Sequence, residues 1–393
     1  MENQYYFVLD IGTTLTKLVA FSFTKKTLLT LHSSIMPTKG VDNGYIVDDD
    51  LLKEMIAEIF KSIPKNLELD GILLVLPSSD LKVYSNSITT KVDGVITSNM
   101  IENMRLDSLK IKIPETHEYI ASYPVKFLVD DSYYYRPPIG IRASTISLNS
   151  TVVTSPKTIA HNYVRLIESV GVPIKDISIN ACTNIKTALY EQESKDGVFL
   201  IDIGGKTTSI SLVQNDVIKV HKRIEIGSEL ITDLIMEKLK VDYITADELK
   251  VRFGNALPSK YNHPIYYYHE SGDYLVENVL YDIVNEGLNN LFSQIKENLD
   301  LMYKENDYPL VFTGGGSHLI NLDKKASLYF SRSVRIAKIK LLGIRHNSFA
   351  SSVGALRDYM ANKLNYYLEH SRIVGDESFD LVTKAIKSNV TTD

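Results

Sequence analysis

Two stretches of the chain, nearly two hundred residues apart, share one pattern of apolar and polar positions. In the first stretch, the apolar run 5–9 is closed by Asp10 and Gly12, and a second β-rich run, 17–23, follows at hairpin distance. Apolar runs of this length around a glycine turn predict a β-hairpin at the start of the chain.

The pattern recurs around position 200. Residues 198–201 are apolar, Asp202 and the glycines that follow it make the turn, and 208–213 return as a strand. The two segments read LDIGTTLTK and IDIGGKTTS. Their separation is far too long for a solenoid repeat and fits a duplicated domain. The sequence therefore predicts an α/β protein with two similar halves.

Helix and strand patterns assign most of the chain between the hairpins to the first half. Helices are predicted over 49–63 and 155–170, and buried strands at 72–76 and 177–179. Residues 81–154 differ, because they read as short strands broken by proline, and we expect them to form an inserted subdomain. Its one helix is expected near 98–108, and its prolines are Pro114, Pro124, Pro137 and Pro138.

The second half continues with helices and reaches a third glycine-rich motif. Helices are predicted over 231–239 and 275–303. The strand 310–312 leads into TGGGS at 313–317, with a further helix expected to begin at its last residue. Residues 362–393 show little core pattern and are interpreted as a terminal appendage.

The composition is that of an ordinary globular protein, with 44% hydrophobic and 23% charged residues. A length of 393 residues accommodates about two to three folding units. The net charge of −5 leaves no general basic surface for a phosphate backbone, so nucleic acid is not an expected partner. The single cysteine, Cys182, and a start without the positive region of a signal peptide favour the cytoplasm. Without a long apolar run, any membrane contact is expected to be peripheral.

The two predicted hairpin turns carry residues suited to phosphate and metal. A strand that ends in Asp and continues into Gly and Thr can present backbone N–H groups and hydroxyls to a phosphate, and the carboxylate can hold Mg²⁺ through water. One such turn is most often only a hairpin turn. Two of them, from duplicated halves, can face each other with a nucleotide between them. The glycines at 314–316 either let the backbone approach an adenine or ribose, or form a tight packing turn.

Together the three motifs resemble those of the superfamily that contains actin, heat-shock chaperones and sugar kinases. Three further segments resemble the FtsA family of bacterial cell-division actin homologues, and the resemblance covers about residues 1–360. These segments are SSIMPTKGVDNGYIVD at 33–48, YPVKFLVDDSYYYRPPIGIRAST at 123–145 and ADELKVRFGNAL at 246–257.

The resemblance implies an actin-like two-domain ATPase fold, with duplicated halves around a nucleotide cleft and an FtsA-type inserted subdomain. The first half is then expected to comprise 1–80, 155–197 and 343–368, with the insertion at 81–154. The second half is expected to comprise 198–227 and 306–342, with a smaller subdomain at 228–305 and a C-terminal tail at 369–393.

ATP and Mg²⁺ are the implied ligands, and no residue is assigned a catalytic role. Asp10 and Asp202 are expected to hold Mg²⁺ through water. The expected nucleotide contacts are Asp10, Gly12, Thr13, Thr14, Lys17, Asp202, Gly204, Gly205, Lys206, Thr207, Gly227, Glu229, Lys250, Gly314, Gly315 and Gly316.

The resemblance also implies partners. The protein is expected to polymerise head to tail through the insertion and to bind the C-terminal tail of FtsZ on 228–305. In this way it would link FtsZ filaments to the inner face of the cell membrane at the division site. Basic side chains expected at the rim of the FtsZ site are Lys250, Arg252 and Lys296.

Family members usually end in an amphipathic membrane-targeting helix. In this chain acidic residues outnumber lysines around the corresponding positions, so packing against the body or a partner is an alternative to membrane binding. The apolar residues that would share one helix face are Phe379, Val382, Ile386 and Val390.

Some positions depart from the family pattern. Lys206 replaces a third glycine, and its charge is expected to hold the γ-phosphate. Asn180 and Ala181 stand where the family has Glu-Pro, so the carboxylate near the attacking water is missing and the protein is expected to be at most a slow ATPase. Glu286 and Asn289 replace an Arg and a Glu, which weakens the usual ribose and adenine contacts.

Two other functions of the same superfamily remain as alternatives. A sugar or small-acid kinase would need a catalytic carboxylate near the first turn, and none is found there. A PilM-like or plasmid-segregating actin would differ in what fills residues 81–154, and the FtsA-like sequence of that segment argues against it.

Overall fold

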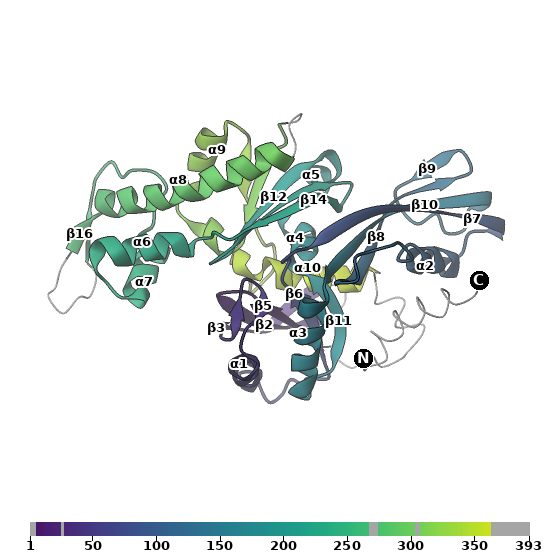
Figure 1. Ribbon diagram of the computed structural model, residues 1–393, viewed down its shortest axis with the longest axis horizontal. Coiled ribbons are helices and arrows are strands. Elements are labelled where there is room, and N and C mark those ends of the chain that lie inside the picture. Colours follow the sequence, from purple (N-terminus) through teal and green to yellow (C-terminus); the bar gives the residue numbers. More distant parts are fainter. Residues whose placement is uncertain (1–4, 25–26, 267–273, 303–306, 363–393) are drawn as a thin grey trace.

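The computed structural model describes residues 5–24, 27–266, 274–302 and 307–362. It contains two five-stranded β-sheets, each flanked by helices, and a four-stranded sheet that extends to one side of them (Figure 1). Within the described residues no helix is both long and apolar enough to cross a membrane. The expected amphipathic face at 379–390 lies outside the described residues.

The strands belong to three main sheets and two short hairpins. The first sheet contains β1 (Tyr5–Ile11), β2 (Leu15–Thr24), β3 (Thr27–Pro37), β6 (Ile72–Leu76) and β11 (Ile174–Ile179). The second sheet contains β12 (Val198–Ile203), β13 (Thr208–Gln214), β14 (Val217–Ile224), β17 (Leu310–Thr313) and β18 (Val334–Ile336). The four-stranded sheet contains β7 (Lys82–Val95), β8 (His117–Val129), β9 (Ser132–Tyr134) and β10 (Arg142–Pro156). The hairpins are β4 (Val41–Asp42) with β5 (Tyr45–Ile46), and β15 (Pro264–Tyr266) with β16 (Tyr274–Val276).

The described helices cover the sheets. The first half has α1 (Asp49–Lys61), α3 (Lys157–Ser169), α4 (Asn180–Ala188), α5 (Glu191–Asp196) and α10 (Ala350–Asn362), and the insertion has α2 (Ser98–Asp107). The second half has α6 (Glu229–Leu239), α7 (Tyr243–Phe253), α8 (Glu277–Met302) and α9 (Leu322–Phe330), with the 3₁₀ turns η1 (Gly315–His318) and η2 (Asn347–Phe349).

The two large sheets are equivalent, which confirms the predicted duplication and both predicted hairpins. The first runs in the order β11-β6-β1-β2-β3 and the second in the order β18-β17-β12-β13-β14. In each sheet the hairpin pair is antiparallel, and its first strand pairs in parallel with the strand on its other side. Asp10 and Asp202 therefore occupy the same penultimate position of equivalent strands, β1 and β12.

The central strands are apolar without interruption because helices cover both of their faces. In β1, Phe7 and Leu9 face a core that includes residues of α1 and α3, whereas Tyr6 and Val8 face a core that includes residues of α10. Successive side chains of a strand point to opposite faces, so each layer takes alternate residues.

Helix α10 returns the chain to the first half after the second half is complete. It packs against the first sheet and against α4, where a Cβ at Gly354 would lie 1.9 Å from the backbone oxygen of Thr183. Ser351 Oγ donates a hydrogen bond to Asn184 Oδ1 at 3.2 Å in the same contact. The two helices can approach this closely only because residue 354 has no side chain.

The insertion forms a sheet of order β7-β10-β8-β9 with α2 packed on it. The prediction of short strands was wrong here, because β7, β8 and β10 span 14, 13 and 15 residues. Pro124 lies inside β8, where the pairing with β10 shifts register beside Ser150. A proline, which lacks an N–H, is tolerated at such an irregularity.

The four helices predicted over 49–63, 155–170, 231–239 and 275–303 begin and end within a few residues of those limits, as α1, α3, α6 and α8, whereas α4, α5, α7 and α10 were not predicted. The helix expected from Ser317 is instead the short η1 turn, and α9 begins only at Leu322. The short strands β4, β5, β15, β16 and β18 were not predicted, and neither were the longer strands β3 and β14. Both are edge strands whose exposed and covered residues alternate, so neither contains a continuous apolar run.

Candidate functional site

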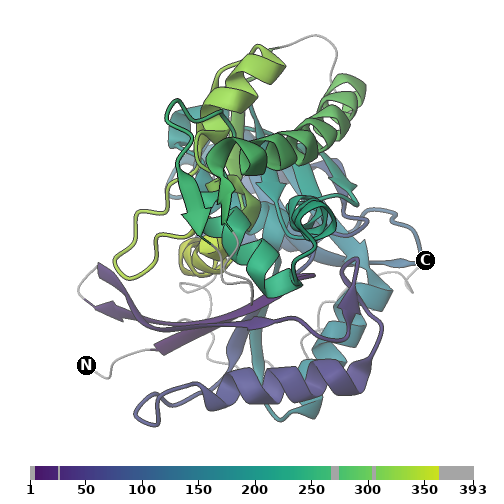
Figure 2. The same cartoon turned by 90° about the vertical axis from the view of Figure 1, so that its left-hand side faces the viewer.

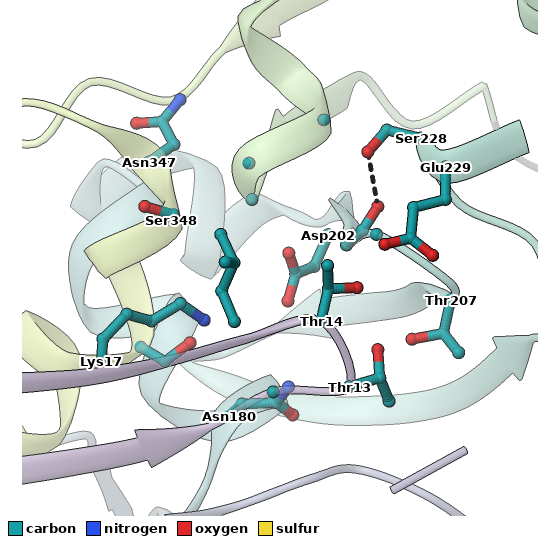
Figure 3. Close-up of a pocket in the computed structure, with 18 of the residues that line it drawn as sticks. Thr13, Thr14, Lys17, Asn180, Asp202, Thr207, Ser228, Glu229, Asn347 and Ser348 are labelled. Carbon is teal, nitrogen blue, oxygen red and sulfur yellow. Dashed lines mark hydrogen bonds between the residues drawn. The ribbon is translucent and has the colours of Figure 1, made fainter. Parts of the chain in front are cut away.

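The three glycine-rich turns meet in one cleft between the two sheets. The β1–β2 turn, the β12–β13 turn and the turn after β17 all line a cavity of about 260 Å³. Figure 3 shows Thr14 and Asp202 directed toward the same space, with Lys17 on one side and Glu229 on the other. Residues that are almost two hundred positions apart in sequence thus share one surface.

The two hairpin turns have the same local structure. The N–H of Gly12 donates to the carbonyl of Leu15 at 3.1 Å, and the N–H of Gly204 donates to the carbonyl of Thr207 at 2.9 Å. A Cβ at Gly12 or Gly204 would lie 2.8 or 2.9 Å from that same carbonyl oxygen. Each turn therefore needs glycine for its own hydrogen bond, whatever it binds.

The two turns also touch each other. A Cβ at Gly205 would lie 2.0 Å from Thr14 Oγ1, and a Cβ at Gly227 would lie 2.2 Å from the carbonyl oxygen of Gly205. Glycine at position 205 lets the two halves approach, and glycine at position 227 lets the chain pack closely behind the second turn.

The third turn packs against the second aspartate. Gly314 has φ of +83°, and a Cβ there would lie 2.2 Å from Asp202 Oδ1. At Gly315 the nearest atom to a Cβ would be the Cβ of Ser348 at 3.8 Å, an ordinary contact. Gly314 therefore makes a tight packing turn, and the same turn lines the cleft. The approach of an adenine or ribose to this turn stays a prediction.

The two aspartates are held differently. Asp10 lies 3.4 Å from Lys17 Nζ. Asp202 accepts a hydrogen bond from Asn184 Nδ2 at 2.9 Å. Burial raises the pKa of Asp202 to about 6, with Lys17 opposing this rise and Asp10 adding to it. A carboxylate in this position gains from a nearby cation, because the cation favours its charged form.

Four residues that line the cleft carry a buried polar atom with no hydrogen-bond partner among the described residues. These atoms are Thr14 Oγ1, Asn180 Oδ1, Arg223 Nη2 and Asn347 Oδ1. Buried polar atoms are normally hydrogen-bonded. These four are therefore suited to contact a bound ligand or its water.

A second polar group lies on the side of the cleft formed by α6 and α7. Tyr243 Oη donates to Glu229 Oε1 at 3.3 Å, and burial raises the pKa of Tyr243 to about 12. Lys250 Nζ donates to Thr232 Oγ1 at 2.6 Å and lies 2.7 Å from Asp247 Oδ1. Lys250 is only 9% exposed, so the prediction that it forms part of a solvated rim was wrong.

Fourteen of the sixteen expected nucleotide contacts line this cleft, and Lys206 and Gly227 do not. Gly227 supports the second turn from behind, as described above. Lys206 Nζ lies 3.8 Å from Asp42 Oδ1 on the first half, so its charge is directed to an ion pair between the halves. Glu286 and Asn289 are exposed on α8 and do not line the cleft either.

Sequence reasoning missed a pair of histidines at the edge of the cleft. The rings of His318 and His346 stack with their centroids 3.8 Å apart. His318 Nε2 accepts the N–H of Asn347 at 2.8 Å, and His346 Nδ1 accepts the N–H of Ser348 at 3.3 Å. Burial lowers the pKa of both rings, that of His318 to about 4. The two residues come from separate turns, and no spacing in the sequence indicated that they meet.

Among the described residues no group of three or more histidine, cysteine or carboxylate side chains is arranged to hold a metal ion directly. The two carboxylates of the cleft, Asp10 and Asp202, are suited to bind a hydrated cation that a phosphate also holds.

The duplicated sheets and the cleft between their hairpin turns define an actin-like protein. Solved structures of this fold align over most of the chain. The PilM–PilN type IV pilus biogenesis complex aligns with a TM-score of 0.60 at 15% identity, over 90% of this chain and 98% of that one. MreB5 of Spiroplasma citri bound to ADP aligns with a TM-score of 0.56 at 15% identity, over 92% and 98%. At these identities the likeness concerns the fold alone.

Sequence comparison gives the family. The family model described as "Cell division protein FtsA" matches residues 199–354, and the model described as "SHS2 domain inserted in FTSA" matches residues 79–154. Together they cover more than half of the chain. The cell division proteins FtsA of Enterococcus hirae and Bacillus subtilis are each 25% identical, over 92% and 91% of this chain and 84% and 83% of their own lengths. The chain belongs to the FtsA family.

The geometry of the third turn predicts different effects for adjacent glycines. Gly314→Ala forces a positive φ on alanine and places its Cβ against Asp202, so we expect the free energy of unfolding to fall by about 2–4 kcal/mol. Gly315→Ala, the matched control, meets only ordinary contact and is expected to change it by less than about 0.5 kcal/mol. Urea unfolding without nucleotide measures both, and equal losses would contradict this account of the turn.

The histidine pair predicts a pH dependence of stability. The unfolded chain protonates His318 below about pH 6.5, whereas the folded protein resists protonation down to about pH 4. The stability held above pH 6.5 is therefore lost as the pH falls from 6.5 toward 4. We expect His318→Gln, which cannot take up a proton, to be more stable than the parent at pH 5 by about 1 kcal/mol, a figure reduced for the partial exposure of the ring. Thermal unfolding of both proteins at pH 5 and pH 7.5 tests this. If the difference in melting temperature between the two proteins is the same at both pH values, His318 is not the source of the pH dependence.

Proposed function

We propose that this protein is a nucleotide-binding scaffold of bacterial cell division. It binds Mg-ATP in the cleft, polymerises head to tail and links FtsZ filaments to the inner face of the cell membrane at the division site. The observation that carries the proposal is the contact between two equivalent Gly-Thr turns, each adjoining an aspartate, within one cleft of an FtsA-family chain.

The residues of the cleft fit the parts of Mg-ATP. The turns at 12–14 and 204–205 would hold the phosphates, with Lys17 beside them. Asp10 and Asp202 would hold Mg²⁺ through water, and the cation would favour the charged form of Asp202 despite its burial. The bound metal would neutralise phosphate charge.

The other end of the nucleotide would lie against the second half. Gly314–Gly316 let the backbone approach closely, and Glu229 and Lys250 supply polar groups from α6 and α7. Because Lys250 is already bonded to Asp247 and Thr232, it is held in place before any ligand arrives. A preorganised side chain loses less conformational entropy on binding.

Binding across the cleft would control assembly through the relative placement of the halves. Among the side-chain contacts that join the halves there, Ser78 Oγ and Ser209 Oγ lie 3.0 Å apart, Lys206 pairs with Asp42, and Asn184 donates to Asp202. A ligand that touches both halves stabilises the closed arrangement only by its differential affinity for it. The MamK double helical filament is an assembly of another protein with this fold, which supports polymerisation as a function of the class.

Nucleotide binding predicts a rise in melting temperature on adding Mg-ATP. At about one hundred times the dissociation constant, a ligand adds about 2.7 kcal/mol to the stability of the folded state. We expect Asp10→Ala and Gly204→Val each to abolish this rise. Asp10→Ala removes a carboxylate proposed to hold the metal. Gly204→Val places a side chain against the carbonyl oxygen of Thr207, which accepts the hydrogen bond of the second turn. Lys222→Ala, on the exposed surface of β14, is the control that keeps the rise. A full rise in both cleft variants would exclude this site.

The residue at position 180 predicts slow turnover. Asn180 begins α4, its Oδ1 is buried at the cleft, and an amide cannot accept a proton at neutral pH. A positioned general base contributes about 100-fold to 10,000-fold. Asn180→Glu is therefore expected to raise phosphate release above the parental rate, whereas Asn180→Gln is not. Phosphate release under single-turnover conditions measures this. A parent that already hydrolyses ATP at about 1 per second or faster would show the prediction to be wrong.

The surfaces proposed for partners are separate from the cleft. The FtsZ tail is placed on the smaller subdomain, where Arg252 and Lys296 are exposed. Contact between copies is placed on the outer end of the insertion, where Tyr135 is 69% exposed and Ile139 is 54% exposed. Apolar side chains exposed at the end of a projecting sheet suit a head-to-tail contact, which makes a filament because it does not close.

The function is tested by sedimenting the protein with FtsZ and lipid vesicles, with and without Mg-ATP. FtsZ is expected in the vesicle pellet only when the protein is present, and in a larger amount with Mg-ATP. Arg252→Glu with Lys296→Glu should reduce the FtsZ fraction alone, and Tyr135→Asp with Ile139→Asp should remove filaments seen by electron microscopy. If FtsZ stays in the supernatant throughout, a PilM-like role becomes the better proposal.

A further inference from the structure

A loop outside the cleft carries basic residues that the proposed nucleotide site does not use. We name residues 337–346, which join β18 to η2, the basic loop; they read AKIKLLGIRH. Lys338, Lys340 and Arg345 are exposed, and no ion pair joins any of them to another described residue. They line a cavity of about 570 Å³ whose lining has no aspartate or glutamate. This local charge is opposite to the net charge of −5 of the whole chain.

The basic loop is anchored so that one leucine points outward. Ile339 and Ile344 are 7% and 2% exposed and belong to the same apolar core as Tyr6 and α10. Between them Leu342 is 76% exposed. The backbone bridge between Leu341 and Ile344 narrows the loop beneath its tip. The exposed leucine is thus held in place from both sides, with cations before and after it.

The tip of the basic loop lies near the last described turn of α10. A Cβ at Gly343 would contact the Cβ of Thr30 at 3.1 Å. Thr30 pairs with Phe21, Phe21 pairs with Tyr6, and the ring of Tyr6 packs edge-on against Tyr359 at 6.1 Å. Neighbouring strands are about 4.8 Å apart, so Thr30 and Tyr6 lie about 10 Å apart across one row of the sheet. The tip of the loop contacts one end of this row, and α10 contacts the other. Figure 2 shows the loop hanging beside β2 and β3.

We propose that the basic loop is a membrane contact, in which Leu342 enters the apolar layer of the bilayer while Lys338, Lys340 and Arg345 meet anionic headgroups. The proposal rests on the proposed function, which places the protein at the membrane. It adds a contact made by the folded body, on the side from which the chain continues beyond α10.

The chemistry favours a lipid surface over an acidic peptide. A bilayer accepts a single protruding leucine without a complementary groove, and the anionic surface attracts neighbouring cations. A peptide would need apolar side chains of its own to cover Leu342. Because the rest of the protein is net negative, the anionic membrane repels other faces and orients the molecule with the basic loop toward it.

The three basic side chains determine how strongly the loop is expected to bind an anionic membrane. Each lysine or arginine close to an anionic surface strengthens binding by about fivefold. Replacing all three with glutamine is therefore expected to weaken binding to anionic vesicles by about 100-fold, and less at high salt because the attraction is screened.

The absence of tryptophan from the chain allows a direct test in the full-length protein. Leu342→Trp introduces one indole at the tip of the basic loop. With vesicles of phosphatidylglycerol and phosphatidylcholine in equal parts, its emission is expected to shift to the blue and to be quenched by brominated acyl chains. With phosphatidylcholine alone neither change is expected. Leu328→Trp is the matched control, because Leu328 is 73% exposed on α9 and should stay in water.

Co-sedimentation with the same vesicles completes the test. The triple variant Lys338→Gln, Lys340→Gln, Arg345→Gln is expected to lose most of its binding while keeping the parental melting temperature and its rise with Mg-ATP. The proposal is overturned if the parent binds the vesicles while the indole at position 342 remains in water, or if the triple variant binds as tightly as the parent. It is also overturned if the parent does not bind these vesicles at all. Loss of the Mg-ATP rise in the parent would instead count against the nucleotide site, so the two failures are distinguishable.

Discussion

The structure depends on bringing two like charges, Asp10 and Asp202, to one cleft from the ends of two equivalent strands. Neither carboxylate is fully solvated, and their repulsion and burial both oppose ionisation of Asp202. Lys17 and Asn184 offset part of this cost, the first by its charge and the second by a hydrogen bond. A cation bound between the two carboxylates would favour the charged form of Asp202.

The helix pair α4 and α10 connects this cleft to the rest of the molecule. Asn180 at the start of α4 lines the cleft, and Asn184 one turn later joins Asp202 of the second half to Ser351 of α10. At the other end of α10, Asp358 accepts a hydrogen bond from Tyr123 Oη of the insertion at 3.5 Å. The cleft, the second half and the insertion therefore all contact one closely packed unit, whose helices touch at Gly354.

The sequence predicted the parts of the fold that short-range patterns control. The hairpins and the helices α1, α3, α6 and α8 follow from apolar periodicity and glycine turns, and the structure places them where expected. The lengths of β7, β8 and β10 were missed because proline and polar residues interrupt their patterns, although pairing in the sheet keeps them extended. The edge strands β3 and β14 were missed for the related reason that only part of each is covered.

The sequence by itself determined the duplication, the three glycine turns and their membership of one cleft, because each rests on a local motif and the motifs recur in equivalent halves. Only the tertiary structure decided how individual side chains are used. It buries Lys250 beside Asp247, turns Lys206 toward Asp42, and stacks His318 on His346. Such contacts depend on how closely elements that are distant in sequence approach each other. A change of a few ångströms in that approach changes side-chain rotamers and burial. The periodicity of residues along the chain does not encode this approach.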